Sequence, residues 1–197
     1  SHLVSVLVAQ RDEVVVYDNL RTGSRENLTP ALGGGNVRLL IGDVLERAFF
    51  ETIRDFRPDV IIHLAALVSV QEARQSPAEN FRLNIEATQR VIEAAIAGRT
   101  RRIVFASSAA VYGDNPGIPL RETERLAPLG LYGGAKAASE LLLAAAAADL
   151  GFEAVALRFF NVFGPRQRAD SPYSGVISIF VDRMTRGLPV TVFGVAQ

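Results

Sequence analysis

Residues 59–64 read DVIIHL and residues 102–106 read RIVFA, two short and almost continuous apolar runs. Such runs are typical of parallel strands covered on both faces. Three further segments, 13–18, 37–41 and 154–159, have the same character. Between them lie segments with helical spacing at 45–56, 77–97, 131–150 and 176–186. This alternation predicts an α/β fold with a doubly wound parallel sheet.

Both ends of the sequence read as incomplete parts of such a fold. Residues 1–7 have helical spacing and lead into the strand that ends in Asp18. In dinucleotide-binding units the acidic residue that ends the second strand lies about 20 residues after a glycine-rich loop. We therefore expect a strand and its glycine loop upstream of Ser1. Residues 190–193 are predicted to be a strand, so the expected domains are 1–174 and an incomplete substrate domain at 175–197.

The composition excludes several classes of function. The chain has 197 residues, 49% of them hydrophobic, and its 21 basic and 21 acidic residues balance to zero net charge. Nucleic acid is therefore not an expected partner, and no apolar run has the length of a membrane helix. The absence of cysteine excludes disulfides and thiolate metal sites and fits a cytoplasmic protein. No metal site is expected, and His63 and His2 are interpreted as structural.

The strongest chemical signal is the sequence YGGAK, in which Tyr132 and Lys136 share one face of a predicted helix. Lys136 is the only lysine in the chain, whereas the other 20 basic residues are arginine. A free tyrosine has a pKa of about 10, and a nearby ammonium is expected to lower this pKa so that the phenol can act as a base. The alternative is an ordinary surface pair, which the solitary lysine makes less attractive.

A second signal is FASSAAVYG at residues 105–113, which leaves the carboxyl end of a predicted strand. Ligands of open parallel sheets bind beyond that end, so a serine hydroxyl there is placed to bond a substrate oxygen. Small residues are also ordinary turn material. The combination with Tyr132 and Lys136 favours a site.

Together these motifs resemble the UDP-glucose 4-epimerase family of NAD-dependent, extended short-chain dehydrogenases/reductases. The resemblance is carried by SSAAVYGD, YxxxK, DNLRTGSRENL, HLAALVSV and RFFNVFGPRQ and extends over essentially the whole chain. It implies a Rossmann domain and a catalytic set of Ser108, Tyr132 and Lys136. Two departures from the family pattern are Val68, where lysine is frequent, and Leu131, where proline is frequent.

The resemblance also implies ligand contacts. Asp18 would bind both adenosine ribose hydroxyls and repel a 2′-phosphate, which favours NAD over NADP. The other implied cofactor contacts are Asn19, Leu20, Asp43, Val44, Leu64, Ala65, Ala66, Asn84, Tyr132, Lys136 and Phe160. The implied UDP-sugar contacts are Ser108, Tyr132, Asn161, Gly175 and Val176. A homodimer through the helices at 77–97 and 131–150 is the arrangement expected from the family.

The predicted reaction is inversion of a nucleotide-sugar at C4 through a transient 4-keto sugar. Related dehydratases and decarboxylases carry acidic residues directly after the catalytic hydroxyl, where this sequence has Ala109 and Ala110. A one-way keto-sugar reductase stays open as an alternative, and so does a non-catalytic NAD-binding module.

Overall fold

The computed structural model describes residues 1–167 and 175–192. The chain divides into two compact units, Ser1–Arg158 and Phe159–Gln197. The boundary predicted between residues 174 and 175 adjoins the undescribed segment 168–174 and stays a prediction.

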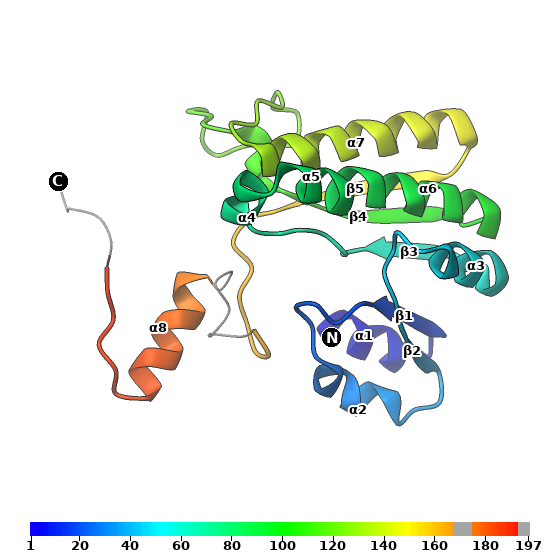
Figure 1. The fold of residues 1–197 in the computed structure, drawn as a ribbon, viewed down its shortest axis with the longest axis horizontal. Helices are drawn as coiled ribbons and strands as arrows, with labels where there is room; N and C mark the ends of the chain where they lie inside the picture. The colour runs from blue at the N-terminus through cyan, green and yellow to red at the C-terminus, as the bar shows by residue number, and fades with distance from the viewer. Residues whose placement is uncertain (168–174, 193–197) are drawn as a thin grey trace. The chain divides into compact units, whose positions relative to one another are not determined.

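All five predicted strands are present in the first unit. They are β1 (Val14–Asp18), β2 (Val37–Ile41), β3 (Val60–His63), β4 (Arg102–Ser108) and β5 (Glu153–Phe159), the last of which ends one residue into the second unit. β1 and β2 form one parallel pair, and β3, β4 and β5 form a second sheet in that order (Figure 1). β3 and β4 are parallel, with Ile61 opposite Ile103 and His63 opposite Phe105. Parallel pairs connected by helices in this way are the pattern of a doubly wound α/β fold.

The helices follow the predicted segments closely. The helix α7 (Leu131–Leu150) has the predicted bounds, while α3 (Arg47–Phe56) starts two residues later and α8 (Val176–Thr185) ends one residue earlier than expected. The segment predicted as one helix at 77–97 consists of α5 (Pro77–Asn80), a π-helical turn η2 (Phe81–Glu86) and α6 (Ala87–Gly98). The helix at the start of the chain is α1 (His2–Ala9).

Several short elements lie between the predicted strands and helices and were not predicted. These are η1 (Arg25–Leu28), α2 (Thr29–Leu32), α4 (Val70–Gln75) and η3 (Ala109–Tyr112). The helix α4 is capped by Ser69, whose hydroxyl oxygen accepts a 3.0 Å hydrogen bond from the Glu72 backbone nitrogen. A cap of this kind stabilises a short helix by satisfying one of its free N–H groups.

Two structural expectations were wrong. Residues 190–192 are coil rather than strand, and Val192 is 73% exposed. In the described part of the second unit, 159–167 and 175–192, the last residue of β5 is the only strand residue, so this segment has no strand of its own unit to pair with. Phe193 lies outside the described residues. β5 is also not covered on both faces, because Val155 and Leu157 are each 41% exposed. β4 does match the expectation, with every residue buried or half-buried.

The core lies between β3, β4 and the helices α3, α6 and α7. Its buried members are Phe49, Ile53, Ile61, Val91, Ile92, Ala94, Ala95, Ile103, Phe105 and Leu143. The helices α3 and α6 approach closely at Gly98, where a Cβ atom would come within 2.8 Å of the Ile53 backbone oxygen. Since α6 also contacts η2 and α7, this packing supports the elements that carry the site.

We predict that Gly98→Ala lowers the free energy of unfolding by about 1–3 kcal/mol, because the added methyl group overpacks the contact between α6 and α3. Urea unfolding of the full-length protein measures the effect. Gly134→Ala is the matched control, since nothing lies within 4 Å of a Cβ atom at that helical glycine. This control should be as stable as wild type or more stable. A Gly98→Ala protein of unchanged stability would contradict the packing described.

Candidate active site

Ser108 is the last residue of β4 and the N-cap of the turn η3 that follows. The Ser108 Oγ accepts a 3.2 Å hydrogen bond from the Ala110 backbone nitrogen, which caps η3. The Ser108 hydroxyl also lies close to the Tyr132 phenol and acts to lower the pKa of that phenol. The predicted proximity of Ser108 and Tyr132 is therefore present, at the carboxyl end of a strand where ligands of such sheets bind.

Tyr132 is brought to Ser108 by a close approach of α7 to η3. A Cβ atom at Gly133 would lie 2.6 Å from the Ala110 carbonyl oxygen, so the helix can come this near only because residue 133 has no side chain. The start of α7 is held from another side by Asn80, whose Nδ2 donates a 3.1 Å hydrogen bond to the Leu131 carbonyl oxygen. These contacts fix the first turn of the helix, on which Tyr132 lies.

Lys136, one helical turn after Tyr132, points inward and is only 2% exposed. Its Nζ donates a 2.9 Å hydrogen bond to the Ala106 carbonyl oxygen of β4. The same nitrogen lies 4.8 Å from the centre of the Phe105 ring and 6.0 Å from the centre of the Tyr132 ring. The single lysine thus places its ammonium between the strand that carries Ser108 and the phenol of Tyr132.

Burial governs the proton equilibria of this pair. Removal from water lowers the pKa of Lys136 from 10.5 to about 8, because it disfavours the charged ammonium. Removal from water also raises the pKa of Tyr132, and the nearby Ser108 hydroxyl acts in the opposite direction. The expectation that Lys136 lowers the pKa of Tyr132 below its usual value is therefore wrong for this state. The ammonium bonds Ala106 rather than the phenol oxygen, and the loss of hydration of the phenolate dominates.

Asn84 lies in the π-helical turn beneath α7 and is 1% exposed. Its Nδ2 donates to the Leu67 carbonyl at 3.1 Å and to Asn80 Oδ1 at 2.8 Å, whereas its Oδ1 has no partner in the described part of the chain. The Asn84 backbone oxygen accepts hydroxyl bonds from Thr88 at 2.7 Å and from Ser139 at 3.1 Å. A π-turn with a buried unpaired oxygen is typical of a functional position.

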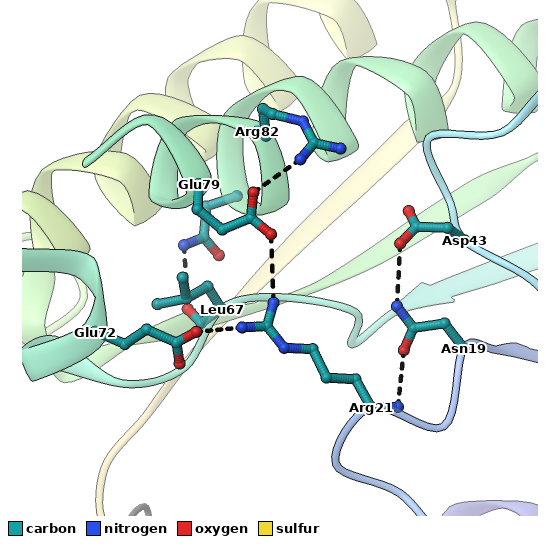
Figure 2. A network of polar contacts seen from close by, with 8 residues as sticks. Asn19, Arg21, Asp43, Leu67, Glu72, Glu79 and Arg82 are labelled. Atoms are coloured by element: carbon teal, nitrogen blue, oxygen red, sulfur yellow. Dashed lines mark hydrogen bonds and ion pairs between the residues drawn. The ribbon is translucent and has the colours of Figure 1, made fainter. Parts of the chain in front are cut away.

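The predicted adenosine side of the site is assembled from the ends of β1 and β2. Asp18 Oδ1 accepts a 2.7 Å hydrogen bond from the Leu20 backbone nitrogen. Asn19 Nδ2 donates to Asp43 Oδ2 at 3.0 Å, so the two predicted segments are adjacent (Figure 2). Val44 follows Asp43 directly. The structure therefore brings together five residues that the resemblance assigned to the cofactor.

Arg21 connects this region to the helices that follow β3. Figure 2 shows its guanidinium between Glu72 of α4 and Glu79 of α5, both of which it pairs with. Its own backbone nitrogen donates to Asn19 Oδ1 at 3.0 Å. Sequence reasoning missed this ion-pair network, because Glu72 and Glu79 lie more than 50 positions away along the chain.

The remaining predicted ligand contacts follow β3 or belong to the second unit. Leu64, Ala65 and Ala66 directly follow β3, with Leu64 54% exposed. Four predicted contacts belong to the second unit and are described within that unit alone: Phe160, Asn161, Gly175 and Val176. Gly175 caps α8 and Val176 is its first residue. The roles of these residues stay predictions.

Comparison with known proteins identifies the family of the chain. Residues 1–197 match the model of the NAD dependent epimerase/dehydratase family. The chain belongs to this family. The resemblance found in the sequence motifs is thereby confirmed.

Solved and curated family members show which reactions occur among its relatives. A UDP-glucose 4-epimerase from Thermotoga maritima, solved with UDP-glucose, is 34% identical with a TM-score of 0.90, over 98% of this chain and 62% of its own. A UDP-glucose 4-epimerase from Thermus thermophilus in complex with NAD is 35% identical with a TM-score of 0.87, over 96% and 60%. UDP-glucuronic acid decarboxylase 1 from Arabidopsis thaliana is 32% identical over 98% of this chain and 44% of its own length. The chain spans 60–62% of the two epimerases.

Two further observations concern membranes and metals. Across residues 1–167 and 175–192, no helix combines the length and apolarity needed to span a bilayer. Within those same ranges, no three His, Asp, Glu or Cys side chains gather where they could hold a metal ion.

His63 lies at the end of β3 beside the site and is 4% exposed. Its Nε2 lies 3.3 Å from the Thr88 hydroxyl, and its ring lies 5.6 Å from that of Phe105. Burial, assisted by the charge of Lys136, lowers the pKa of His63 from 6.5 to about 3. His63 is therefore neutral at physiological pH, which agrees with its interpretation as a structural residue.

This shift predicts acid lability. As the pH falls from 6.5 towards about 3, the unfolded chain protonates at residue 63 and the folded chain does not, so the free energy of unfolding decreases. His63→Gln should flatten this dependence, which urea unfolding at a series of pH values measures. His2→Gln, at the exposed second histidine, is the control and should keep the wild-type slope. An unchanged slope in His63→Gln would show that the burial of this ring is misjudged.

Proposed function

We propose that the full-length protein interconverts the C4 epimers of a UDP-sugar, the glucose and galactose forms or their N-acetylhexosamine counterparts, with NAD as its bound cofactor. The observation that carries the proposal is the arrangement of Ser108, Tyr132 and Lys136. The Tyr132 phenol lies close to the strand-end Ser108 and beside the buried ammonium of the only lysine. Membership of the epimerase/dehydratase family supports the same conclusion.

The described residues fit a dinucleotide. The carboxylate of Asp18 ends β1 on an exposed surface, where ribose hydroxyls can donate to it and a phosphate is repelled. At the other end, the buried Oδ1 of Asn84, which has no partner among the described residues, lies in η2. This turn packs against α7, the helix that carries Lys136. Asp18, Asn19 and Asp43 would hold the adenosine, and Lys136 and Tyr132 the nicotinamide ribose. When bound, NAD supplies a reversible acceptor for the hydride of the sugar C4.

The protein side chains would handle the proton. Tyr132 takes the proton of the C4 hydroxyl, while the Ser108 hydroxyl bonds the same oxygen and holds it at the phenol. Lys136 carries its positive charge below a pKa of about 8 and would bind the nicotinamide ribose. Because burial raises the pKa of Tyr132, the phenol retains a proton readily and can return it to the oxygen when the 4-keto sugar is reduced on its other face.

Related reactions need groups that this site does not present. The relatives include a UDP-glucuronic acid decarboxylase. In this chain the two residues after Ser108 are Ala109 and Ala110, which form η3 and have no titratable group. This disfavours decarboxylation and dehydration, each of which moves a further proton. A one-way keto-sugar reductase shares the whole constellation and is separated from an epimerase only by its net consumption of reduced cofactor.

We predict that full-length protein given UDP-glucose or UDP-N-acetylglucosamine, without added reductant, forms the C4 epimer. With substrate deuterated at C4, proton NMR should find the deuterium retained at C4 of the product. Tyr132→Phe should lose about 100-fold or more of the turnover, because general acid–base catalysis contributes at least that factor. Tyr17→Phe, which removes a phenol oxygen on β1, should turn over as wild type does.

Three results would contradict this proposal. Net oxidation of NADH with a keto-sugar, and no epimer, would identify a reductase. Release of carbon dioxide from UDP-glucuronic acid would identify a decarboxylase. NAD binding without turnover of any UDP-sugar, equal in wild type and Tyr132→Phe, would identify a binding module.

A further inference from the structure

A buried charged pair lies directly behind the candidate site. Arg158 near the end of β5 and Glu140 of α7 have side chains only 19% and 8% exposed. The Arg158 Nε donates to both Glu140 oxygens, at 3.1 and 3.2 Å, and its Nη2 donates to Glu140 Oε2 at 2.9 Å. This two-pronged geometry is the strong form of an arginine–carboxylate pair.

The pair is also connected to the turn that follows β4. Arg158 Nη1 donates to the Tyr112 hydroxyl at 3.0 Å and to the Glu122 backbone oxygen at 2.9 Å. Its guanidinium carbon lies 4.9 Å from the centre of the Tyr112 ring. One arginine therefore connects β5, α7, η3 and the loop before α7, and the carboxylate raises its pKa further.

The remaining contact of the pair reaches the catalytic strand. Ser107, the residue before Ser108, donates its hydroxyl to Glu140 Oε1 and is 4% exposed. Successive residues in β4 alternate between two faces, so Ser107 points to the pair and Ser108 to the opposite face. A bond that fixes Ser107 thus fixes the backbone from which the Ser108 hydroxyl projects.

Three side chains of α7, spaced one turn apart, face the end of β4. Tyr132, Lys136 and Glu140 are spaced by four and share a face of the helix. Tyr132 lies close to Ser108, Lys136 donates to the Ala106 carbonyl, and Glu140 accepts from Ser107. The helix therefore faces the last three residues of β4 at three consecutive turns, and it is hydrogen-bonded to them at Lys136 and Glu140. Of these two bonds, the one at Glu140 is itself held by a further charged partner, Arg158.

The stability of the protein does not by itself explain the buried pair of Glu140 and Arg158. Buried ion pairs contribute little net stability compared with apolar side chains of the same volume, so stability alone is a weak reason for this one. What such a pair does supply is a fixed geometry, since both partners must keep their bonds while buried. Here that geometry sets the spacing between the strand of Ser108 and the helix of Tyr132.

We propose that Glu140 and Arg158 are positioning residues, which act through Ser107 to hold Ser108 beside Tyr132. The inference rests on the proposed function, since the positioned groups are the catalytic ones. The Ser107 hydroxyl and the Glu140 carboxylate are already bonded to each other and to Arg158, so their loss should affect the chemical step rather than binding.

The kinetic test uses Ser107→Ala and Glu140→Gln in the full-length protein. Ser107→Ala removes the contact with the strand and leaves the ion pair whole, so it stays informative where Glu140→Gln folds poorly. Each variant should lower kcat by about tenfold to 100-fold with an unchanged KM for the UDP-sugar, because displacement of a reacting group by about 1 Å can cost ~100-fold. Glu153→Gln is the matched control: Glu153 pairs with Arg101 and Arg102, so it joins β5 to β4 at their other end, and its side chain is 52% exposed. The control should keep the wild-type kcat.

A second readout does not depend on turnover. Because the nearby Ser108 hydroxyl acts to lower the pKa of Tyr132, displacement of Ser108 should raise this pKa. Ultraviolet difference titration measures it, with the same variant carrying Tyr132→Phe as the blank. A higher pKa of Tyr132 in Ser107→Ala, in a protein that lacks epimerase activity, would support the positioning role and overturn the proposed function. An unchanged kcat and an unchanged pKa of Tyr132 in folded Ser107→Ala, or an equal loss of kcat in Glu153→Gln, would overturn the positioning role.

Discussion

A buried ammonium bonded to a strand carbonyl is the contact on which the rest of the site depends. Lys136 reaches from α7 to the Ala106 oxygen and in doing so gives up most of its hydration. Such a charge is costly to bury, and the cost appears as a pKa lowered to about 8. The helix is bonded to β4 a second time one turn later, where Ser107 donates to Glu140, and this second bond helps to hold the lysine in place. The phenol and the serine hydroxyl are brought together by the same attachment.

The fold was largely predictable from the sequence, because parallel strands and long helices have strong local patterns. The helix α7 has its predicted bounds, and all five strands occur where the apolar runs lie. The short elements were not predictable in this way. The π-turn η2 is hidden in a continuous helical pattern, and it is held by tertiary bonds such as those of Asn84 to Leu67 and Ser139.

The catalytic candidates were predictable for a different reason, namely that their chemistry requires particular residue types at fixed spacing. Tyr132 and Lys136 lie one helical turn apart, and Ser108 ends a strand. Their supporting residues carry no such local signal: Arg158 and Glu140 are 18 positions apart, and Ser107 and Glu140 are 33 apart. The direction of the Tyr132 pKa shift was also beyond sequence reasoning, because it depends on how deeply the phenol is buried.

The pKa of the Lys136 side chain tests most directly whether its ammonium is buried and bonded to β4, as the site requires. Selective 13C labelling of lysine in the full-length protein, with Lys136→Met to assign the signal, allows its titration to be followed by NMR. The structure predicts a midpoint near pH 8, well below the ordinary 10.5. A midpoint at the ordinary value would mean that the ammonium is solvated, and the site as described would not exist.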